Sequence, residues 1–397
     1  MLFEFDSIFS QKADLKVVGV GGAGGNAVNR MINSGMEGVD FCVINTDTQD
    51  LEKSLAEKKL QIGKSLTKGL GAGAKAELGR QAITEDREAV QSLLANADMV
   101  FITAGMGGGT GTGAAPMIAE ISKELGILTV GIVTLPFTFE GPKRMARALT
   151  GVTELRKICD TLLVIPNQKL MSIVEKQTTF IDAFQIADSI LHQAASGISD
   201  LINVQGMINL DFADVETIMS NMGEAVMGTG TATGDEKAVL AAQQAISSPL
   251  LDNVSISGAQ GVLVNITGGT KMTLFEVDEA ASIIFEEAGK DANLIFGAVI
   301  DPTMHDELRV TVIATGFSKP RPIEDPLVET LYTRPTQGNQ TRILMEEKEN
   351  VPAYIKKENI EISQPENRKP TFSFGDGEVN FLDTDFEIPS FIRQQNK

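Results

Sequence analysis

The sequence predicts an α/β fold: a parallel-sheet, phosphate-binding domain joined by a long central helix to a smaller α/β domain with a mixed sheet, followed by a disordered C-terminal tail. Short apolar runs alternate with helical patterns through most of the chain, which is typical of a sheet covered by helices on both faces. Three glycine-rich segments each lie between an apolar run and a helical pattern, and the composition changes after Ser318. The expected segments are a flexible leader (1–14), the phosphate-binding domain (15–179), the central helix (180–202), the second domain (203–318), a disordered linker (319–380) and a terminal docking peptide (381–397).

Composition excludes several classes of protein. A chain of 397 residues with 42% hydrophobic content can bury a large core. Its net charge of −19 argues against nucleic-acid partners and anionic membranes, so local backbone dipoles would hold a phosphate. No apolar run approaches the ~20 residues of a membrane span, and no signal peptide is recognised. Cys42 and Cys159 are expected to be buried free thiols, as in a cytoplasmic protein, and no metal-ligand spacing involves them or His192 and His305.

The first strand (16–20) leads into Gly21-Gly22-Ala23-Gly24-Gly25-Asn26 and a helix expected over 27–34. In this context Gly19-x-Gly21-x-x-Gly24 is the fingerprint of dinucleotide-binding proteins. Asp40 or Asp47 would supply the acidic residue that the fingerprint expects about 20 positions later. An NAD-dependent oxidoreductase is therefore one open interpretation.

The second strand (41–44) ends in Asn45-Thr46-Asp47, at the edge of the sheet where parallel α/β proteins bind ligands. Asp47 has two equally supported interpretations, a carboxylate for a magnesium-bound water and the N-cap of a helix over 48–56. A short third strand closes with Gln61-Ile62. Gly69-Leu70-Gly71-Ala72-Gly73-Ala74 then precedes a helix expected over 75–96.

The densest glycine segment is Gly107-Gly108-Gly109-Thr110-Gly111-Thr112-Gly113, between a buried strand (99–102) and a helical pattern over 117–125. Glycine lets the backbone approach an anion closely, a helix N-terminus favours negative charge, and threonine hydroxyls add donors. Because a dinucleotide fold does not need this second glycine segment, three such segments favour a ligand with several phosphates. No Gly-x-x-x-x-Gly-Lys-Ser/Thr motif occurs, so the P-loop class is unsupported.

Polar residues follow the next two strands (128–133 and 161–165). Glu140 could bond ribose hydroxyls and Arg144 could reach a phosphate or the base. Without the other glycine segments, a solvated pair that opens the helix expected over 142–158 would be the preferred interpretation. Asn167 follows the second of these strands, and its amide could read a purine edge.

Residues 180–202 form a long amphipathic helix. On it, Phe184 could stack on a base and Asp188 could accept a base N–H, with core packing and solvation as the ordinary alternatives. Further on, Asp211 and Asp214 share one face of the first turn of a helix expected over 212–221, either as capping carboxylates or as a pair that orients water or a cation. A helix of about 30 Å separates them from the glycine segments, so they cannot serve the phosphate site of their own molecule.

The second domain shows a looser alternation of strands and helices. We expect a strand and turn (223–230), helices (235–247 and 276–289) and strands (261–267, 294–300 and 308–315), the last two of which could pair antiparallel. Gly228-x-Gly230 and Gly268-Gly269 are interpreted as turns. No residue from 223 onward is expected to be catalytic.

The tail differs in composition from the rest. Eight of the fourteen prolines lie at or beyond Pro320, and apolar periodicity disappears to about residue 380, which predicts a disordered linker. Apolar residues return in 381–393, which is typical of a segment that folds on a partner, although an inert solubilising tail is the alternative. The segment lacks a basic amphipathic face, so no direct membrane insertion is expected.

Six motifs, in order and spacing, resemble those of the tubulin/FtsZ family of GTPases over roughly residues 15–317. They are 21–26, Asn45-Thr46-Asp47, 107–113, Phe139-Glu140-Gly141, Ile165-Pro166-Asn167 and the segment 209–214. The resemblance implies a cytoplasmic GTPase that polymerises head to tail and forms the cytokinetic ring of bacterial cell division at mid-cell, beneath the inner membrane. It also implies Mg²⁺ at the nucleotide, and leaves open whether K⁺ joins it.

The resemblance assigns roles to residues. GTP or GDP would be held by Gly22, Ala23, Gly24, Gly25, Asn26, the whole of 107–113, Glu140, Arg144, Asn167, Phe184 and Asp188, while Asp47 and Gly71, Ala72, Gly73 and Ala74 would sense the γ-phosphate. Asn209, Asp211 and Asp214 would complete the active site of the next subunit. The segment 381–393 would dock on membrane-tethering division proteins such as the actin-like FtsA. Two alternatives stay open: the NAD-dependent oxidoreductase, and a nucleotide-binding scaffold without hydrolysis in which Asp211 and Asp214 only cap a helix.

Overall fold

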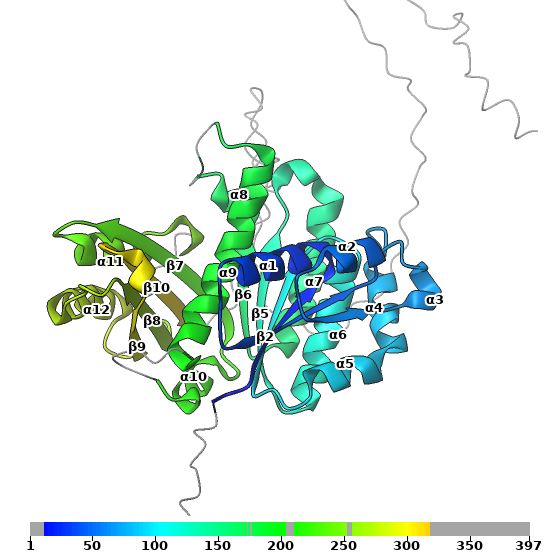
Figure 1. Cartoon of the computed structure of the whole chain (residues 1–397), viewed down its shortest axis with the longest axis horizontal. Coiled ribbons are helices and arrows are strands. Elements are labelled where there is room, and N and C mark those ends of the chain that lie inside the picture. Colours follow the sequence, from blue (N-terminus) through cyan, green and yellow to red (C-terminus); the bar gives the residue numbers. More distant parts are fainter. Residues whose placement is uncertain (1–11, 173, 175–176, 204–209, 252–255, 318–397) are drawn as a thin grey trace, which may run out of the picture. The chain divides into compact units, whose positions relative to one another are not determined.

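A ten-stranded sheet is the central feature of the computed structural model, which describes residues 12–172, 174, 177–203, 210–251 and 256–317. The strand order is β3-β2-β1-β4-β5-β6-β7-β10-β8-β9 (Figure 1). The strands are β1 (Leu15–Val20), β2 (Val39–Asn45), β3 (Lys58–Gln61), β4 (Met99–Gly105), β5 (Leu128–Leu135), β6 (Thr161–Pro166), β7 (Gly223–Thr233), β8 (Gly261–Gly268), β9 (Asn293–Ile300) and β10 (Glu307–Thr315). The predicted linker and docking peptide (319–397) lie outside the described residues.

Strands β1 to β6 are parallel. Their helices are α1 (Gly21–Asn33), α2 (Thr48–Lys53), α3 (Lys64–Thr67), α4 (Ala76–Glu85), α5 (Arg87–Leu94), α6 (Thr110–Glu124), α7 (Pro142–Ile158) and α8 (Asn167–Leu170), with the 3-10 turn η1 (Thr138–Glu140). Alternate residues of a strand serve opposite faces: Leu15 and Val17 of β1 pack with α1 and α9 (Phe180–Asn203), while Val18 and Val20 pack with α4 to α7. The predicted parallel sheet covered on both faces is confirmed.

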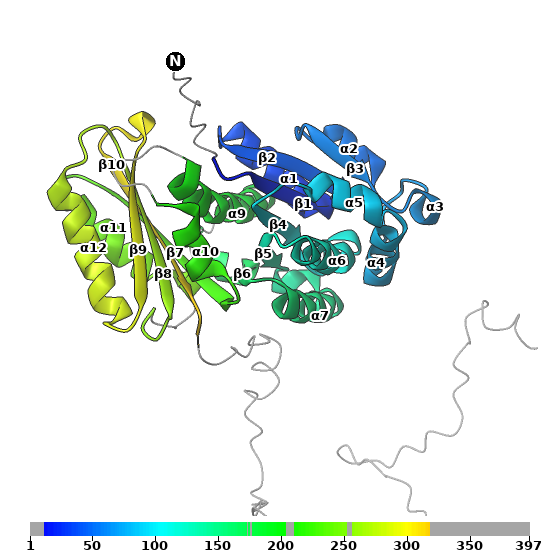
Figure 2. The same ribbon diagram turned by 90° about the horizontal axis from the view of Figure 1, so that it is seen from below.

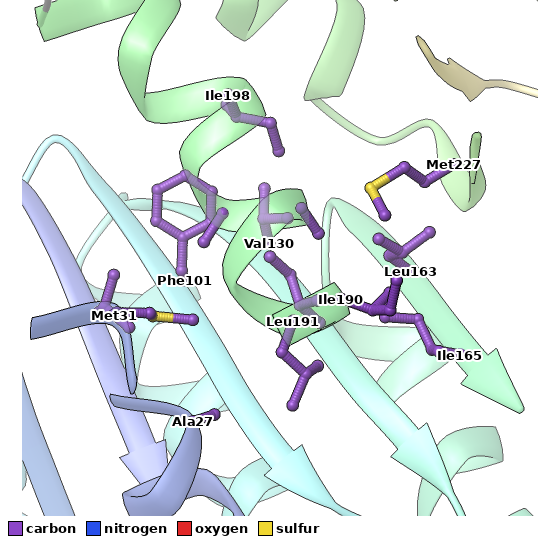
Figure 3. Close-up of a cluster of buried hydrophobic side chains, with 14 of the residues drawn as sticks. Ala27, Met31, Phe101, Val130, Leu163, Ile165, Ile190, Leu191, Ile198 and Met227 are labelled. Carbon is purple, nitrogen blue, oxygen red and sulfur yellow. The ribbon is translucent and has the colours of Figure 1, made fainter. Parts of the chain in front are cut away.

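The long helix α9 lies at the junction of the two halves of the sheet. Figure 3 shows its residues Ile190, Leu191 and Ile198 within one buried cluster that also holds Phe101 of β4 and Met227 of β7. Strands β6 and β7 join the two halves through a short parallel pairing, from Thr161↔Gly223 to Leu163↔Ala225. One core therefore spans both halves, and α9 supplies its centre.

In the C-terminal half, α11 (Lys237–Ile246) and α12 (Leu274–Ala288) cover one face of the sheet, and α9 and α10 (Phe212–Met219) cover the other (Figure 2). The turns η2 (Pro249–Leu251) and η3 (Pro302–Met304) complete this half. The expected antiparallel pairing of the last two strands is wrong. Strand β10 pairs antiparallel with β7 and β8, and β9 pairs parallel with β8 at the edge, because β10 inserts between β7 and β8.

Three further expectations need correction. Gly228 and Gly230 lie inside β7 rather than in a turn: a Cβ on either would lie 2.0 and 2.1 Å from carbonyl oxygens of α11, so their role is close helix packing. The predicted helix 75–96 is two helices, because Asp86 leaves helical geometry while its carboxylate accepts a hydrogen bond from Gly63 N–H at 2.7 Å. Helices α1 and α6 also begin earlier than expected, inside the glycine segments.

Candidate nucleotide site

The glycine segments after β1 and β4 meet where the strand order reverses. Strands β1 and β4 are neighbours, and each is followed directly by a helix, α1 and α6. This is the crevice at which open α/β sheets bind ligands. A Cβ on Gly21 would lie 3.0 Å from Gly111 N, so the two segments are in contact.

Glycine at the starts of α1 and α6 lets both helices pack closely on the sheet. As a result, the N-termini of the two helices lie next to each other. A Cβ on Gly24 would lie 2.4 Å from Thr103 O, and one on Gly111 would lie 2.8 Å from Gly105 O. Bulkier residues would push α1 and α6 away from the sheet. The first-turn N–H groups of a helix have no partner within the helix and favour an anion.

The third segment, 69–74, closes over the same place. Thr48 N–H donates a hydrogen bond to Gly69 O at 3.1 Å, and Asp47 forms an isolated antiparallel β-bridge with Leu70. A Cβ on Gly109 would lie 2.8 Å from Ala72 Cβ. Gly69, Gly71, Gly73 and Ala74 have positive φ, which is unstrained only for the glycines. The segment 69–74 therefore lies against the starts of α2 and α6. It follows the short helix α3 and not a strand, so the expectation that all three glycine segments come directly after strands is wrong for this one.

Asp47 is the N-cap of α2. Its Oδ1 accepts hydrogen bonds from Gln49 N–H at 2.9 Å and Asp50 N–H at 3.4 Å, so the capping interpretation holds. The other oxygen, Oδ2, lies 3.4 Å from the position of a Cβ on Gly71. The carboxylate thus lies between the start of α2 and the segment 69–74.

Glu140 and Arg144 form an ion pair, which was the alternative to their nucleotide-binding roles, at 2.9 Å between Glu140 Oε2 and Arg144 Nη1. Glu140 also accepts a hydrogen bond from Phe137 N–H at 2.8 Å and is largely buried, whereas Arg144 is half exposed. The Arg144 backbone packs on Gly107, whose carbonyl accepts a hydrogen bond from Arg147 Nε at 3.1 Å. The pair is therefore attached to the densest glycine segment.

Of the residues proposed for the base, Asp188 lines a cavity beside α1. Asp188, Asn26 and Arg30 line a cavity of about 390 Å³ together with Asn29, Asn33 and Ser34. Burial raises the pKa of Asp188 to about 6, although the Arg30 charge opposes the shift. Asn167 is 5% exposed, and its Oδ1 has no hydrogen-bond partner among the described residues. The Phe184 ring packs edge-on against Phe137, with the ring centroids 5.3 Å apart.

An unpartnered buried acceptor and a raised carboxyl pKa are both costly in the free protein. A ligand that donates N–H groups would relieve both. Guanine, which carries such donors on its Watson–Crick edge, has this chemistry. Asn167 and Asp188 thus offer acceptors of the kind that a guanine base would need.

The acidic pair lies elsewhere. Asp211 and Asp214 are exposed at the start of α10, and the Asp211 side chain makes no capping hydrogen bond. Helix α9, with 24 residues or about 36 Å of helical rise, leads from the α8 end to the α10 end (Figure 1). Asn209 lies outside the described residues.

Sequence reasoning missed Asn29, Arg30 and Asn33, which line the cavity. With Asn26 they recur at helical spacing along α1, opposite its buried residues Ala27, Val28 and Met31. That polar stripe was the available signal. Arg147, which donates to Gly107 O, was also missed, and no sequence pattern distinguishes it from an ordinary surface residue.

Among the described residues, no group of three or more His, Cys, Asp or Glu side chains is arranged to hold a metal ion. No helix among them is both long enough and apolar enough to span a bilayer.

Comparison with known proteins identifies relatives. Residues 14–175 match the GTPase domain of the Tubulin/FtsZ family, and residues 223–318 match the C-terminal domain of the FtsZ family. An empty FtsZ dimer from M. jannaschii is 45% identical and covers 77% of this chain and 88% of its own, with a TM-score of 0.74. Two proteins from Haloferax volcanii share the fold: a GDP-bound CetZ1 monomer (21% identity, 80% and 97% coverage, TM-score 0.67) and a GTPγS-bound CetZ2 protofilament (22%, 80% and 96%, 0.64).

Proposed function

The chain belongs to the tubulin/FtsZ family of polymerising GTPases, and from that premise we propose a filament-forming role in bacterial cell division, with each active site shared between two subunits. Family membership rules against both the oxidoreductase and the non-hydrolysing scaffold. In the sheet, Asp40 is also badly placed for a dinucleotide ribose: it lies at the amino end of β2 and pairs with Lys58 at 2.5 Å.

Within the pocket, the proposed roles follow from position. The N-termini of α1 and α6 and the segment 69–74 would hold the phosphates. Glu140 would bond the ribose hydroxyls, and Arg144 would reach a phosphate or the base. Asn167, Phe184 and Asp188 would hold guanine. These groups bind and position, which is most of what phosphoryl transfer requires.

The observation that carries the shared site is the distance between its two parts. The phosphate end and the exposed Asp211 and Asp214 lie at opposite ends of α9. A second copy stacked head to tail would bring its acidic turn to the phosphates of the first. Its carboxylates would then orient the attacking water, so assembly would activate hydrolysis.

Mg²⁺ would be held chiefly by the nucleotide and water. Mg²⁺ commonly binds through substrate phosphates with only one or two protein carboxylates. Asp47 Oδ2 is the candidate for a bond to a metal-bound water, because Oδ1 already caps α2.

The division role and the terminal peptide are further parts of this proposal. The similar structures named above come from archaea, so the bacterial setting rests on the resemblance of the motifs and of the segment 381–393. That segment would recruit a membrane-tethering protein of the FtsA type and place the filament at mid-cell. A fluorescent fusion expressed in a bacterial host, with and without 381–393, tests this: a mid-cell ring only with the segment is expected.

A concentration series tests the shared site. Phosphate release per molecule should rise with protein concentration above a threshold and then level off, because monomers hold only half of the site. Light scattering after GTP addition should rise over the same range. A specific activity that is constant from dilute monomer upward would contradict sharing.

Mixing two defective proteins is a sharper test. Asp214→Asn should bind GTP normally but lose most turnover, whereas Asn167→Ala should lose nucleotide affinity and keep its acidic turn. Mixed together, they should recover phosphate release, because the intact pocket of one meets the intact acidic turn of the other. Asp235→Asn, an exposed aspartate beside α11, is the matched control and should behave as wild type.

A further inference from the structure

Two buried threonines connect the loop after β2 to the start of α6. Thr46 Oγ1 and Thr110 Oγ1 lie 2.7 Å apart, and the residues are 0% and 8% exposed. Thr46 immediately follows β2, and Thr110 is the first residue of α6. In the described part of the chain, Thr110 is the one hydrogen-bond partner of the Thr46 hydroxyl.

The backbone on either side of Thr46 is held by its neighbours. Thr46 O lies 3.3 Å from Thr67 Oγ1, which also lies 3.1 Å from Gly63 O. The next residue, Asp47, caps α2 and forms a β-bridge with Leu70. The buried Thr46 hydroxyl lies against Thr110 from this backbone.

Thr110 itself lies at the phosphate end of the pocket. A Cβ on Gly21 would lie 3.4 Å from Thr110 Cβ, so the side chain lies between the starts of α1 and α6. Its hydroxyl has one proton and two lone pairs. Either the proton or a lone pair of Thr110 Oγ1 faces Thr46. The direction of that hydrogen bond decides whether Thr110 can present a proton or only a lone pair to a ligand.

We propose that Thr46 is a positioning residue: it donates its proton to Thr110 Oγ1, and Thr110 then donates its own proton to a phosphate oxygen. An ionised phosphate oxygen has no proton to give, so a Thr110 hydroxyl that donated to Thr46 would turn a lone pair toward the anion. Donation from Thr46 selects the favourable orientation. This inference rests on the proposed guanine-nucleotide site and adds to it a residue that does not touch the nucleotide.

The chain offers a matched control on the same helix. Thr129 Oγ1 and Ser122 Oγ lie 2.8 Å apart, and both residues are 0% exposed. Ser122 lies near the far end of α6, and Thr129 lies on β5. Thr129→Val therefore removes the same kind of buried hydroxyl pair at a place remote from the phosphates.

The experiment compares GDP with guanosine, which lacks phosphates, by competition against a fluorescent guanine nucleotide. Thr46→Val should weaken GDP binding about tenfold, as expected for one hydrogen bond, and change guanosine binding less than about twofold. Thr46→Ser, which keeps the hydroxyl, should restore GDP affinity. Thr129→Val should leave GDP affinity unchanged.

Two outcomes would overturn the inference: unchanged GDP affinity in Thr46→Val, or equal losses for GDP and guanosine, which would indicate general damage to the fold. A double-mutant comparison adds an independent criterion. Thr46→Val together with Thr110→Val should bind GDP as Thr110→Val does, because Thr46 acts only through Thr110. Additive losses would show that Thr46 acts by another route.

A second variant covers failure to fold. If circular dichroism shows that Thr46→Val is unfolded, Thr46→Ala removes the hydroxyl without placing a methyl group against Thr110 and is judged by the same criteria. Wild-type protein that fails to bind GDP would refute the proposed nucleotide site itself. Wild-type protein that binds GDP while Thr46→Val matches Thr129→Val would refute only the role of Thr46.

Discussion

At the scale of single residues, the pocket retains polar groups that a purely structural core would avoid. Asn167 Oδ1 is buried without a partner among the described residues, and burial raises the pKa of Asp188 to about 6. Both features cost stability in the free protein, because a buried polar or charged group has lost its water. We attribute their presence to the ligand proposed above.

The raised pKa of Asp188 predicts a pH-dependent affinity. Guanine N–H donors require the ionised carboxylate, so GDP binding should weaken as the pH falls through about 6, by up to about tenfold per pH unit below it. The dissociation constant of GDP, measured from about pH 5 to about pH 8, tests this. Asp188→Asn should bind more weakly and lose this part of the dependence. Equal slopes in both proteins would assign the titration to the phosphates.

The raised pKa of Asp188 also predicts how the stability of the nucleotide-free protein depends on pH, and this dependence is opposite in sign to that of GDP affinity. The folded pKa of Asp188 lies above its ordinary 3.8, so its contribution to stability is fully present below pH 3.8 and is lost as the pH rises through about 6. At neutral pH, Asp188→Asn should therefore raise the Tm of nucleotide-free protein while weakening GDP binding. A lower Tm would show that the charged carboxylate is stabilising.

At the scale of elements, glycine determines how closely helices approach. A Cβ on Gly113 of α6 would lie 1.8 Å from Ala76 O of α4, and one on Gly79 of α4 would lie 2.6 Å from Gly109 O. The two helices thus cross with their backbones in contact. This crossing holds the segment 69–74 against the start of α6, so packing between elements shapes the phosphate end of the pocket.

Gly113→Ala should therefore destabilise the protein although alanine is the better helix former. Relieving a contact with backbone requires α4 to move, which typically costs about 1–3 kcal/mol. Denaturant unfolding measures this, and GDP affinity should fall as well. Gly108→Ala is the control for stability, because a Cβ there meets no atom within 4 Å and the backbone φ is not positive. Equal stabilities of the two variants would contradict the packing argument.

At the scale of the whole molecule, α9 separates the glycine segments from the acidic turn of Asp211 and Asp214 and also carries the shared core. Residues such as Ile190 and Leu191 pack with strands from both halves of the sheet (Figure 3). Because α9 is buried in the shared core, it holds the pocket and the acidic turn at a fixed separation. We therefore propose that a second copy in the filament supplies the acidic turn that completes the site.

Deleting 381–397 should leave GTP turnover unchanged and abolish binding to a membrane-tethering partner. The described fold closes with β10, which pairs with β7 and β8 inside the sheet. Phosphate release and co-sedimentation with partner-coated vesicles measure the two activities. A chain whose residues 381–397 are shuffled, keeping length and charge, is the control and should also lose the partner. Reduced turnover in the deletion would assign the tail a role in assembly.

Local patterns predicted much of this molecule because local physics produces it. The alternation of apolar runs and helical patterns predicted the parallel sheet, and the glycine segments 21–26 and 107–113 marked the connections at which α1 and α6 begin. The errors are non-local: Gly228 and Gly230 pack against α11, and the pairing of β10 depends on a strand far earlier in the chain. The roles of the pocket residues and the domain boundaries stay predictions.

By itself, the sequence determined the fold class, the three phosphate-type segments and the resemblance to a GTPase family, because each is carried by residues close together in the chain. Only the tertiary structure decided which groups meet: the two buried threonine hydroxyls, the polar stripe of α1 beside Asp188, and the separation of pocket and acidic turn. Those juxtapositions join segments tens of residues apart, and they depend on how helices pack across the sheet, which no local pattern encodes.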